Sequence, residues 1–386
     1  MRRAEYWSLV LAGSIVGFVW GANQVALSIY LYDIGLDAAQ IGVIYGISTA
    51  FMTAGSLIWG YLADLYDRRK LFYILSGASA ALTASMASAN PSAVAISYIV
   101  ASFLNRGVVY SAILGDYAKT HGVSNEAFAA SSSLSSFFAA LGSLSSSITS
   151  IGVQGFRALY LLEALVISTS AALLTLTEPM PRVERGAFSL DVRRLRSYWL
   201  LKRLIPETLV GLGAGVIIPL FSLWFYLKFH VAMASLSITY TISDLTLALG
   251  AMSAPSIAKI FKSRVDAVVV LQAVATALLA SMPFISSAEA DLALFIARTA
   301  LMNMANPLLS ALINDLTPRE ERGRMFGLWN TLSNVPRALG PAVGGYLMSA
   351  GFIDAPLLIT AGLYAIAVIL FKILLGQVEA RSASGQ

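Results

Sequence analysis

Apolar residues fill this chain in long runs that are separated by short polar or charged segments. A helix needs about 20 predominantly apolar residues to cross the hydrocarbon core of a bilayer, and twelve runs reach that length. A soluble fold of 386 residues could not bury so many of them. The pattern therefore predicts twelve membrane-spanning helices, at residues 6–32, 38–63, 70–89, 92–116, 125–150, 156–178, 204–228, 237–260, 266–287, 291–313, 324–350 and 354–376.

Composition agrees with a membrane protein. Hydrophobic residues make up 57% of the chain and charged residues 12%, whereas about a quarter of an ordinary globular chain is charged. The first run follows a basic start, Met1-Arg2-Arg3, but it is too long for the apolar region of a signal peptide, so we expect it to remain as a helix. There are no cysteines, which excludes disulfides and thiolate metal sites. We therefore expect an all-α integral membrane protein.

Positive charge is concentrated on one side of the predicted spans. Most of the 26 basic residues lie at the two termini and in the loops that follow the second, fourth, sixth, eighth and tenth spans. Loops rich in Lys and Arg face the cytoplasm. The distribution predicts a multi-pass protein of the cell membrane with both termini in the cytoplasm. It also accounts for the net charge of +5 without a nucleic-acid partner.

The longest polar interval, residues 179–203, divides the chain into two sets of six spans. We predict an N-terminal six-helix bundle at 1–178, a cytoplasmic linker at 179–203 and a C-terminal six-helix bundle with a short tail at 204–386. Short segments recur in the same order in both halves: Gly115-Asp116 resembles Asn314-Asp315, and residues 140–143 resemble residues 338–341. Repeats of this kind build two lobes around a central site in many secondary transporters.

One polar turn and two further motifs point to a particular family. Residues 60–71 read Gly-Tyr-Leu-Ala-Asp-Leu-Tyr-Asp-Arg-Arg-Lys-Leu, which resembles the signature loop between the second and third spans of the major facilitator superfamily. Leu65 and Asp67 depart from that signature. Residues 319–324 with 340–346, and Asn105-Arg106-Gly107 on the fourth span, are similar to other patterns of this superfamily. The resemblance implies two pseudo-symmetric six-helix bundles that transport a solute by alternating access.

The resemblance also implies a conformational charge network on the cytoplasmic side. Its members would be Asp64, Arg68, Asp116 and Arg324, which lie at the inner ends of the second, fourth and eleventh spans. The alternative is that these charges only orient the chain or are solvated. A motif rich in Gly and Pro, typical of the fifth helix in drug/proton antiporters, is absent, because residues 141–147 read Leu-Gly-Ser-Leu-Ser-Ser-Ser.

Two arginines lie deep in predicted spans, Arg106 in the fourth and Arg298 in the tenth. A charge at the bilayer centre costs about 2.5–3.5 kcal/mol on insertion scales, so each should face a cavity or a partner. They are candidates for binding an anionic group of a solute. The alternative is a structural ion pair, for which Glu163 is available to Arg106.

Three acidic residues are predicted to lie within spans: Glu163, Glu207 and Asp244. Removal from water changes how readily a carboxyl group takes up a proton, which a proton-coupling site requires. All three are proton-coupling candidates. Asp244 is preferred because the resemblance places the eighth helix at the interface between the lobes.

Amide side chains interrupt two spans that the resemblance places around a central cavity. Asn23 and Gln24 lie in the first span and Asn303 in the tenth, while Tyr110 lies one turn beyond Arg106. These residues are candidates for hydrogen bonds to a solute. The alternative is hydrogen bonding between helices, which contributes less than about 2 kcal/mol in membranes.

No enzyme motif is present. The sequence has no phosphate-binding loop, no metal-binding cluster and no serine with a suitable histidine base, so we predict neither an enzyme nor a cofactor. We expect a monomeric secondary active transporter that moves a small organic solute and is coupled to protons. Two alternatives stay open: a proton-independent exchanger or facilitator of organic anions, and a transport-inactive receptor or scaffold with the same fold.

Overall fold

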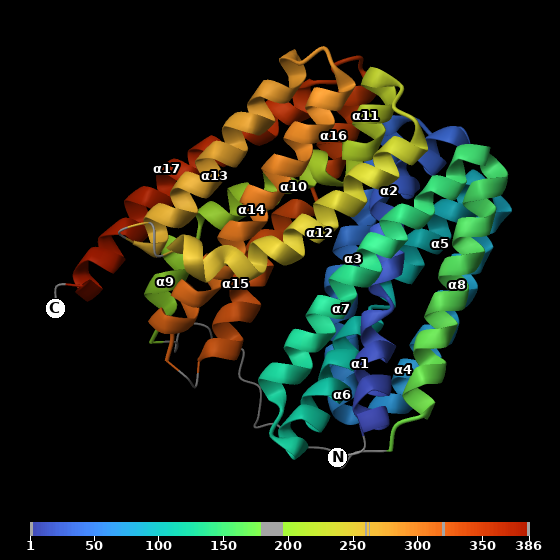
Figure 1. Ribbon diagram of the computed structural model, residues 1–386, viewed down its shortest axis with the longest axis horizontal. Coiled ribbons are helices and arrows are strands. Elements are labelled where there is room, and N and C mark those ends of the chain that lie inside the picture. Colours follow the sequence, from blue (N-terminus) through green and yellow to red (C-terminus); the bar gives the residue numbers. More distant parts are fainter. Residues whose placement is uncertain (1–2, 179–195, 259–260, 262, 319–320, 384–386) are drawn as a thin grey trace. The chain divides into compact units, whose positions relative to one another are not determined.

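The computed structural model describes residues 3–178, 196–258, 261, 263–318 and 321–383, and all regular secondary structure in these residues is helical (Figure 1). Ten helices or joined helix pairs among the described residues are long and apolar enough to cross a membrane. They correspond to ten of the twelve predicted spans. The eighth and eleventh predicted spans correspond to α12 (Met233–Ala258) and to α15 (Arg322–Arg337) followed by α16 (Gly340–Ser349).

The other spans follow in chain order. The N-terminal half contains α1 (Arg3–Ser14) with α2 (Gly17–Asp33), α3 (Ala38–Leu65), α4 (Arg68–Ser85), α5 (Pro91–Phe103) with α6 (Arg106–His121), α7 (Ser124–Ser145) and α8 (Val153–Thr175). The short α9 (Tyr198–Arg203) precedes the C-terminal half, which contains α10 (Pro206–Ile217) with α11 (Phe221–Phe229), α13 (Arg264–Ser281), α14 (Ala288–Leu316) and α17 (Ala355–Ala383). Most of the predicted linker, residues 179–195, lies outside the described residues.

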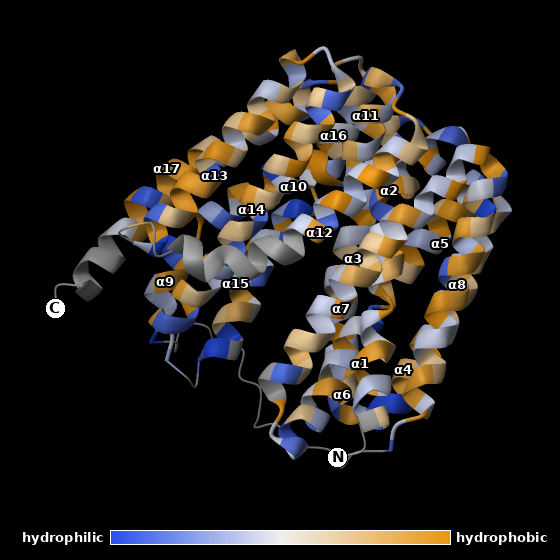
Figure 2. Ribbon diagram, in the orientation of Figure 1, coloured by the Kyte–Doolittle hydropathy of each residue, from blue (hydrophilic) through white to orange (hydrophobic). Residues whose placement is uncertain are grey.

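Apolar residues recur along most of these helices (Figure 2), and many of them are exposed. Ile74, Leu161, Leu165 and Ile369 are each more than half exposed although they lie in the middle of spans. Exposed apolar surface on this scale is unusual for a soluble monomer. It matches helices whose outer faces contact lipid.

Several predicted spans are interrupted, and proline explains two of the interruptions. Pro219 lies in a single 3₁₀ turn (Ile218–Leu220) between α10 and α11, and Pro336 lies just before the break between α15 and α16. Proline lacks an amide hydrogen and its ring collides with the carbonyl four residues earlier, so it bends or ends a helix. The first span is also broken, at residues 15–16.

The break in the fourth span has a different cause. α5 ends at Phe103 and α6 begins at Arg106, and the Phe103 carbonyl and the Asn105 side chain at the break have hydrogen-bond partners on α3. The indole of Trp59 donates to the Phe103 carbonyl at 2.8 Å, and the side-chain amide of Asn105 donates to the Ser56 hydroxyl at 2.8 Å. Polar backbone groups at membrane depth need such partners. As a result Arg106 starts a new helix inside the span.

The chain forms two compact units, and each contains one helix end from the opposite half. Unit 1 comprises residues 1–37, 47–186 and 230–245, and unit 2 comprises residues 38–46, 187–229 and 246–386. Unit 1 therefore includes the first half of α12, and unit 2 includes the start of α3. The predicted division at 178 and 204 stays a prediction.

In unit 1, glycine residues allow two helices to pack with their backbones in contact. A Cβ added to Gly17, Gly21 or Gly142 would collide with a backbone carbonyl of the facing helix, so α2 and α7 are in backbone contact. Small residues allow such approach in membrane helices. In unit 2 the same holds for α10 against α15 and α16, where Gly211 and Gly344 are the contact points. The two halves thus repeat the packing of their first and fifth spans.

The start of α3 and the first half of α12, which belong to the unit of the opposite half, are also tightly packed. In unit 2 the first turns of α3 lie against α16, where Gly42 meets the Pro341 carbonyl and the Ala39 amide donates to the Ser349 hydroxyl at 2.8 Å. In unit 1 the first half of α12 lies against α7, and Thr241 donates to the Ala140 carbonyl at 3.3 Å. Both contacts join a helix of one half of the chain to helices of the other half.

Candidate functional site

A polar cluster lies inside unit 1, between α2, α6 and α8. The Asn23 amide donates to Glu163 Oε2 at 2.9 Å and to the Val19 carbonyl at 2.8 Å. Glu163 is 1% exposed and Arg106 9% exposed. The two charges are close enough to interact electrostatically, but among the described residues no ion pair joins them.

This cluster is incompletely hydrogen-bonded. Asn23 Oδ1, Glu163 Oε1 and Arg106 Nε are all buried and have no hydrogen-bond partner among the described residues. Buried polar groups are almost always paired, so each exception needs an explanation. Two acceptors and one donor are therefore available here to a polar ligand.

A second buried carboxyl group joins α12 to α2 and α7. Ser143 Oγ donates to Asp244 Oδ2 at 2.7 Å, and the Gln24 amide donates to Asp244 Oδ1 at 3.5 Å. Ser143 is fully buried and Asp244 is 6% exposed. Asn23 and Gln24 are adjacent in sequence, so neighbouring residues of α2 contact two different buried carboxyl groups. Ser143 is not among the site residues that the sequence predicts.

Tyr110 lies in the hydrophobic core of unit 1 rather than in this polar cluster. Its hydroxyl donates to the Leu9 and Val10 carbonyls at 3.2 and 3.3 Å and lies 3.3 Å from Ser131 Oγ. The ring is 7% exposed and belongs to the apolar cluster around Val109 and Tyr117. Its contacts are those of a core residue.

Arg298 is the buried cation of unit 2. It is 3% exposed, and its guanidinium lies over the rings of Phe221 and Tyr364 at 5.8 and 5.9 Å. Nε and Nη2 have no hydrogen-bond partner in the part of the chain that the structure describes. Aromatic faces attract a cation but accept none of its hydrogen bonds, so Arg298 keeps donors for an anionic group.

The remaining candidates in unit 2 have local partners. The Asn303 amide donates to the Thr299 carbonyl of its own helix at 2.9 Å, and Asn306 donates to Asn303 Oδ1 at 3.3 Å. Glu207 lies in the first turn of α10, is 6% exposed and lies near Trp329 and Arg337 of α15. Neither Asn303 nor Glu207 contacts Arg298 in a described hydrogen bond or ion pair.

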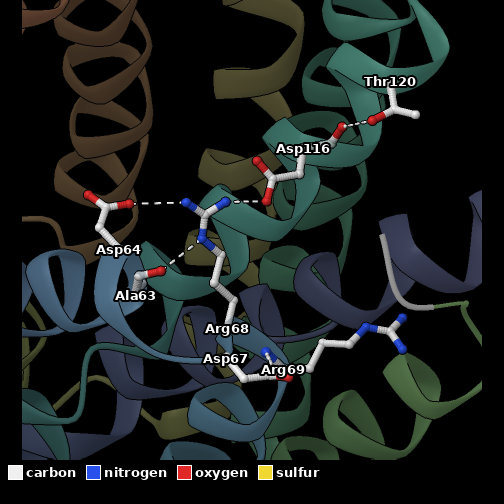
Figure 3. A network of polar contacts seen from close by, with 7 residues as sticks. All are labelled: Ala63, Asp64, Asp67, Arg68, Arg69, Asp116 and Thr120. Atoms are coloured by element: carbon white, nitrogen blue, oxygen red, sulfur yellow. Dashed lines mark hydrogen bonds and ion pairs between the residues drawn. The ribbon is translucent and has the colours of Figure 1, made fainter. Parts of the chain in front are cut away.

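Three of the four residues of the predicted charge network meet in unit 1 (Figure 3). Arg68 lies between two acids, pairing with Asp116 of α6 and with Asp64 of α3, the latter at 3.0 Å. Its Nε also donates to the Ala63 carbonyl at 2.9 Å. Asp67 caps α4 by accepting from the backbone amides of Arg69 and Lys70, which fixes the helix that carries Arg68.

A cavity of about 290 Å³ adjoins this network, next to the last residues of the sixth span. Arg68, Arg69, Asp116 and Thr177 are among its lining residues, and Arg69 donates to the Thr177 hydroxyl. The network is therefore accessible to small polar molecules at one edge.

Arg324 lies in unit 2, where its charge acts on Glu321. Glu321 is 6% exposed, and it accepts hydrogen bonds from the Ser197 hydroxyl and from the amides of Arg196 and Ser197, the amides at 2.8 and 3.0 Å. The Ser197 hydroxyl bond, with help from these amides and Arg324, holds the pKa of Glu321 below its usual range. A network between Arg324 and Asp64 stays a prediction.

Among the described residues, no group of three His, Cys, Asp or Glu side chains is placed to hold a metal ion. The polar clusters instead combine single charges with amides and hydroxyls. Such groups hold small molecules by hydrogen bonds, and few are needed to orient a ligand in an apolar pocket.

The fold matches solved structures of membrane transporters over almost its whole length. The nucleoside transporter NupG aligns with a TM-score of 0.79 at 15% identity, covering 97% of this chain and 99% of that chain. A bacterial homolog of the human lysosomal transporter Spinster aligns with a TM-score of 0.76 at 12% identity, covering 97% of both chains. A D-xylose-proton symporter aligns with a TM-score of 0.71 at 13% identity, covering 96% and 98%. At these identities the likeness shows the fold alone.

No curated protein sequence matches the chain. The protein has the all-α membrane fold of secondary transporters, with two pseudo-symmetric bundles of six helices. The family model of the Major Facilitator Superfamily matches residues 9–288 and 204–385, and the chain belongs to that superfamily. The protein is therefore a multi-pass secondary transporter of small solutes, and not an enzyme.

Proposed function

We propose that this protein transports a small polar organic solute by alternating access and couples its movement to protons. One observation carries the proposal: adjacent amides of α2, Asn23 and Gln24, hydrogen-bond to two different buried carboxyl groups. Ionisable side chains within membrane spans are costly and mark solute and proton pathways. Because one helix, α2, is bonded to both acids, we infer that it links a solute site at Glu163 to a proton site at Asp244.

The solute site is assigned to Asn23, Arg106 and Glu163. Their three unpaired atoms require a solute that offers both hydrogen-bond donors and an acceptor. Arg106 begins α6, so the free amides of that helix's first turn reinforce its preference for a negative or carbonyl group. A hydroxylated or amino-bearing solute with a carboxylate or carbonyl fits these demands. Gln24, Asn303 and Arg298 are proposed as further contacts.

The coupling proton is assigned to Asp244. An ionised carboxylate accepts hydrogen bonds strongly on both oxygens, whereas a protonated one has an O–H donor and is a weaker acceptor at that oxygen. Protonation therefore weakens one of the two bonds to Ser143 and Gln24. Because these bonds attach α12 to the opposite half of the chain, loss of one favours release of α12. Glu163 and Glu207 are the other proton-site candidates.

A second candidate function is organic-anion exchange without protons. The observation that favours it is Arg298, a buried guanidinium with two unpartnered nitrogens and no acid bonded to it among the described residues. In that case Arg298 and Arg106 bind an anionic solute directly. The charge of the solute then replaces the proton in driving the conformational change.

We also propose an orientation in the membrane and an oligomeric state. We place both termini in the cytoplasm because Lys and Arg are concentrated in the loops on that side. The protein is proposed to act as a monomer in the cell membrane, with Asp64, Arg68, Asp116 and Arg324 as a network that stabilises one conformation.

Flux measurements in liposomes test the proposal. A thermal-shift screen of the purified protein against metabolites first supplies a solute, and its uptake is then measured with and without a pH gradient. We expect a gradient to increase uptake by wild type and by Glu126→Gln, which changes an exposed acid of α7. Asp244→Asn should remove the response to the gradient, and Arg106→Gln should abolish solute binding.

Three results would count against it. Uptake of an anion that ignores the pH gradient and is lost in Arg298→Gln supports the exchanger instead. An unchanged gradient response in Asp244→Asn removes Asp244 from the coupling role. If Arg106→Gln binds the solute with the same affinity as wild type, Arg106 is not part of the solute site.

A further inference from the structure

One buried acid in unit 2, Asp291, has no role in the transport function proposed for this protein. Asp291 lies in the first turn of α14 and is 0% exposed. Neither of its carboxyl oxygens has a hydrogen-bond partner among the described residues. A buried carboxylate is costly unless it is paired and hydrogen-bonded. Asp291 therefore needs either a proton or a cation.

Two charges act electrostatically on Asp291: Lys228, at the end of α11, and Asp354, just before α17. The Lys228 ammonium donates to Asp354 Oδ1 at 3.0 Å and to the Pro283 carbonyl at 2.7 Å. An ammonium has three donors, so one N–H of Lys228 is not used in these bonds. The side chains of Lys228 and Asp354 are 18% and 40% exposed, so this end of the cluster reaches solvent.

Trp224 is also part of this cluster. Its indole N–H donates to Asp354 Oδ1 at 3.0 Å, and its ring lies 5.0 Å from the Lys228 ammonium. The same lysine lies over the ring of Phe229 at 5.3 Å. A change in the partner of Lys228 would therefore change the surroundings of the Trp224 indole.

Few other ionisable groups approach Asp291. On its own helix Glu289 is exposed and bonds to Ser287 at 2.8 Å, and Arg298 lies two turns further on against aromatic rings. α13 has no ionisable residue after Asp266, which lies at its far end. On α17 the first ionisable group is Tyr364, beside Arg298. Asp291, Lys228 and Asp354 thus form a separate set of two acids and one base.

One ammonium cannot neutralise two carboxylates. We propose that Asp291 is a proton-binding site, and that loss of its proton to water transfers Lys228 from Asp354 to Asp291. In the state described here Lys228 pairs with Asp354, and the proton on Asp291 keeps the buried acid neutral. In the other state Lys228 pairs with Asp291, and the exposed Asp354 is solvated.

The transfer couples proton binding to helix contacts. Lys228 ends the seventh span, Asp354 begins the twelfth and Asp291 begins the tenth. Loss of the proton would therefore exchange a bond between the seventh and twelfth spans for a bond between the seventh and tenth. This site is separate from Asp244 and Glu163, so it stands or falls independently of the function proposed above.

Fluorescence of Trp224 tests the transfer in the purified full-length protein in detergent. The chain has six tryptophans, so the Trp224 contribution is taken as the difference between wild type and Trp224→Phe. We expect this contribution to change in a single step as pH rises. Asp291→Asn should lose the step, and the matched control Glu289→Gln, two residues away on the same turn, should keep it.

Infrared difference spectra identify the proton itself. A protonated carboxyl absorbs apart from a carboxylate, and the protonated band that disappears across the fluorescence step should be missing in Asp291→Asn. In Lys228→Gln the band should persist to higher pH, because the cation that stabilises the charged acid is gone. Circular dichroism and gel filtration establish that each variant is folded. A step or band that survives in folded Asp291→Asn, or a wild type without either, overturns the proposal.

Discussion

The two halves of the chain carry an ion pair at corresponding positions but surround it differently. In unit 1 Arg68 pairs with Asp116, and the two side chains are only 7% and 10% exposed. In unit 2 Arg264 pairs with Asp315 at 2.5 Å, and the side chains are 43% and 57% exposed. Asp116 and Asp315 occupy matching places in the repeat. The first pair lies inside a network, whereas the second lies at the surface.

The difference shows that the repeat preserves the pair but not its role. Arg68 also bonds to Asp64 and to the Ala63 carbonyl, so it fixes the turn between α3 and α4 to α6. Removing one partner of a buried pair leaves an uncompensated charge, which is far more costly than the loss of a surface pair. The N-terminal network is therefore the element on which stability and conformational control depend.

Substitution of Arg68 should produce the largest effect. Arg68→Met leaves Asp116 buried without its cation, and we expect a loss of about 3–5 kcal/mol in the free energy of unfolding. Unfolding by denaturant in mixed micelles measures it, with Arg264→Met as the matched variant in the other half. Equal losses in the two variants would contradict the distinction between the halves.

A double variant separates the value of the pair from the cost of an unpaired charge. Replacing a whole buried pair by apolar residues of similar size is often neutral or stabilising. Arg68→Met with Asp116→Leu should therefore be more stable than Arg68→Met alone. If the double variant is less stable, the polar contacts themselves stabilise the fold.

The next largest effect should be at Glu321, which binds the end of the linker in unit 2. Hydrogen bonds to charged groups contribute about 1.5–3 kcal/mol, so Glu321→Gln should lose that order of stability at pH 7. The pKa of Glu321 is lowered in the folded protein, so its contribution is complete above the unfolded pKa of about 4.3. The contribution is lost as pH falls through the folded pKa.

The pH dependence of this contribution can be tested by comparing wild type with Glu321→Gln. The difference in Tm between wild type and Glu321→Gln should be constant near neutral pH and shrink once the pH falls below about 4. Ser197→Ala removes one donor to the same carboxylate and should reproduce part of the effect. A difference that grows toward acid pH would mean that Glu321 does not act as a carboxylate acceptor.

The fold was largely predictable because the length of each apolar run sets where a helix can cross the bilayer. The prolines at 219 and 336 are also visible signals for the breaks in the seventh and eleventh spans. The break after Phe103 was not predictable, since its partners, Trp59 and Ser56, come from another helix. Only tertiary packing reveals it.

The site was predicted less completely, for a related reason. Asp64, Arg68 and Asp116 follow from the motif, and the structure brings them together. Tyr110 was placed near Arg106 because residues four apart share a helix face. Side chains of helices lean toward the N-terminus, however, and Arg106 begins α6, so it extends beyond the helix while Tyr110 packs on α1. The burial of Asp291 could not be predicted, because it is the first residue of a predicted span, where an acid is expected to be solvated.

Asp64 should have a small effect on stability and a larger one on transport. Its side chain is 48% exposed, and exposed ion pairs contribute about 0.2–1 kcal/mol. Asp64→Asn should therefore fold and reach the membrane normally while lowering solute uptake, since Arg68 keeps Asp116 and the Ala63 carbonyl but loses the negative charge of Asp64. Uptake per molecule in liposomes measures this. Unchanged uptake would limit the network to a structural role.

The smallest effect should be at the surface pair of unit 2. Arg264→Met should cost no more than about 0.5–1 kcal/mol at low salt, because water already solvates both partners. Salt distinguishes the halves further: at 1 M ionic strength the Debye length is about 3 Å, so the Arg264→Met loss should vanish while the Arg68→Met loss persists. Unfolding curves of the two variants at low and high salt provide the measurement. A salt-sensitive loss in Arg68→Met would mean that the pair of Arg68 and Asp116 is itself solvated, although only one edge of the network adjoins the cavity, and that this pair contributes as little to stability as the pair of the C-terminal half.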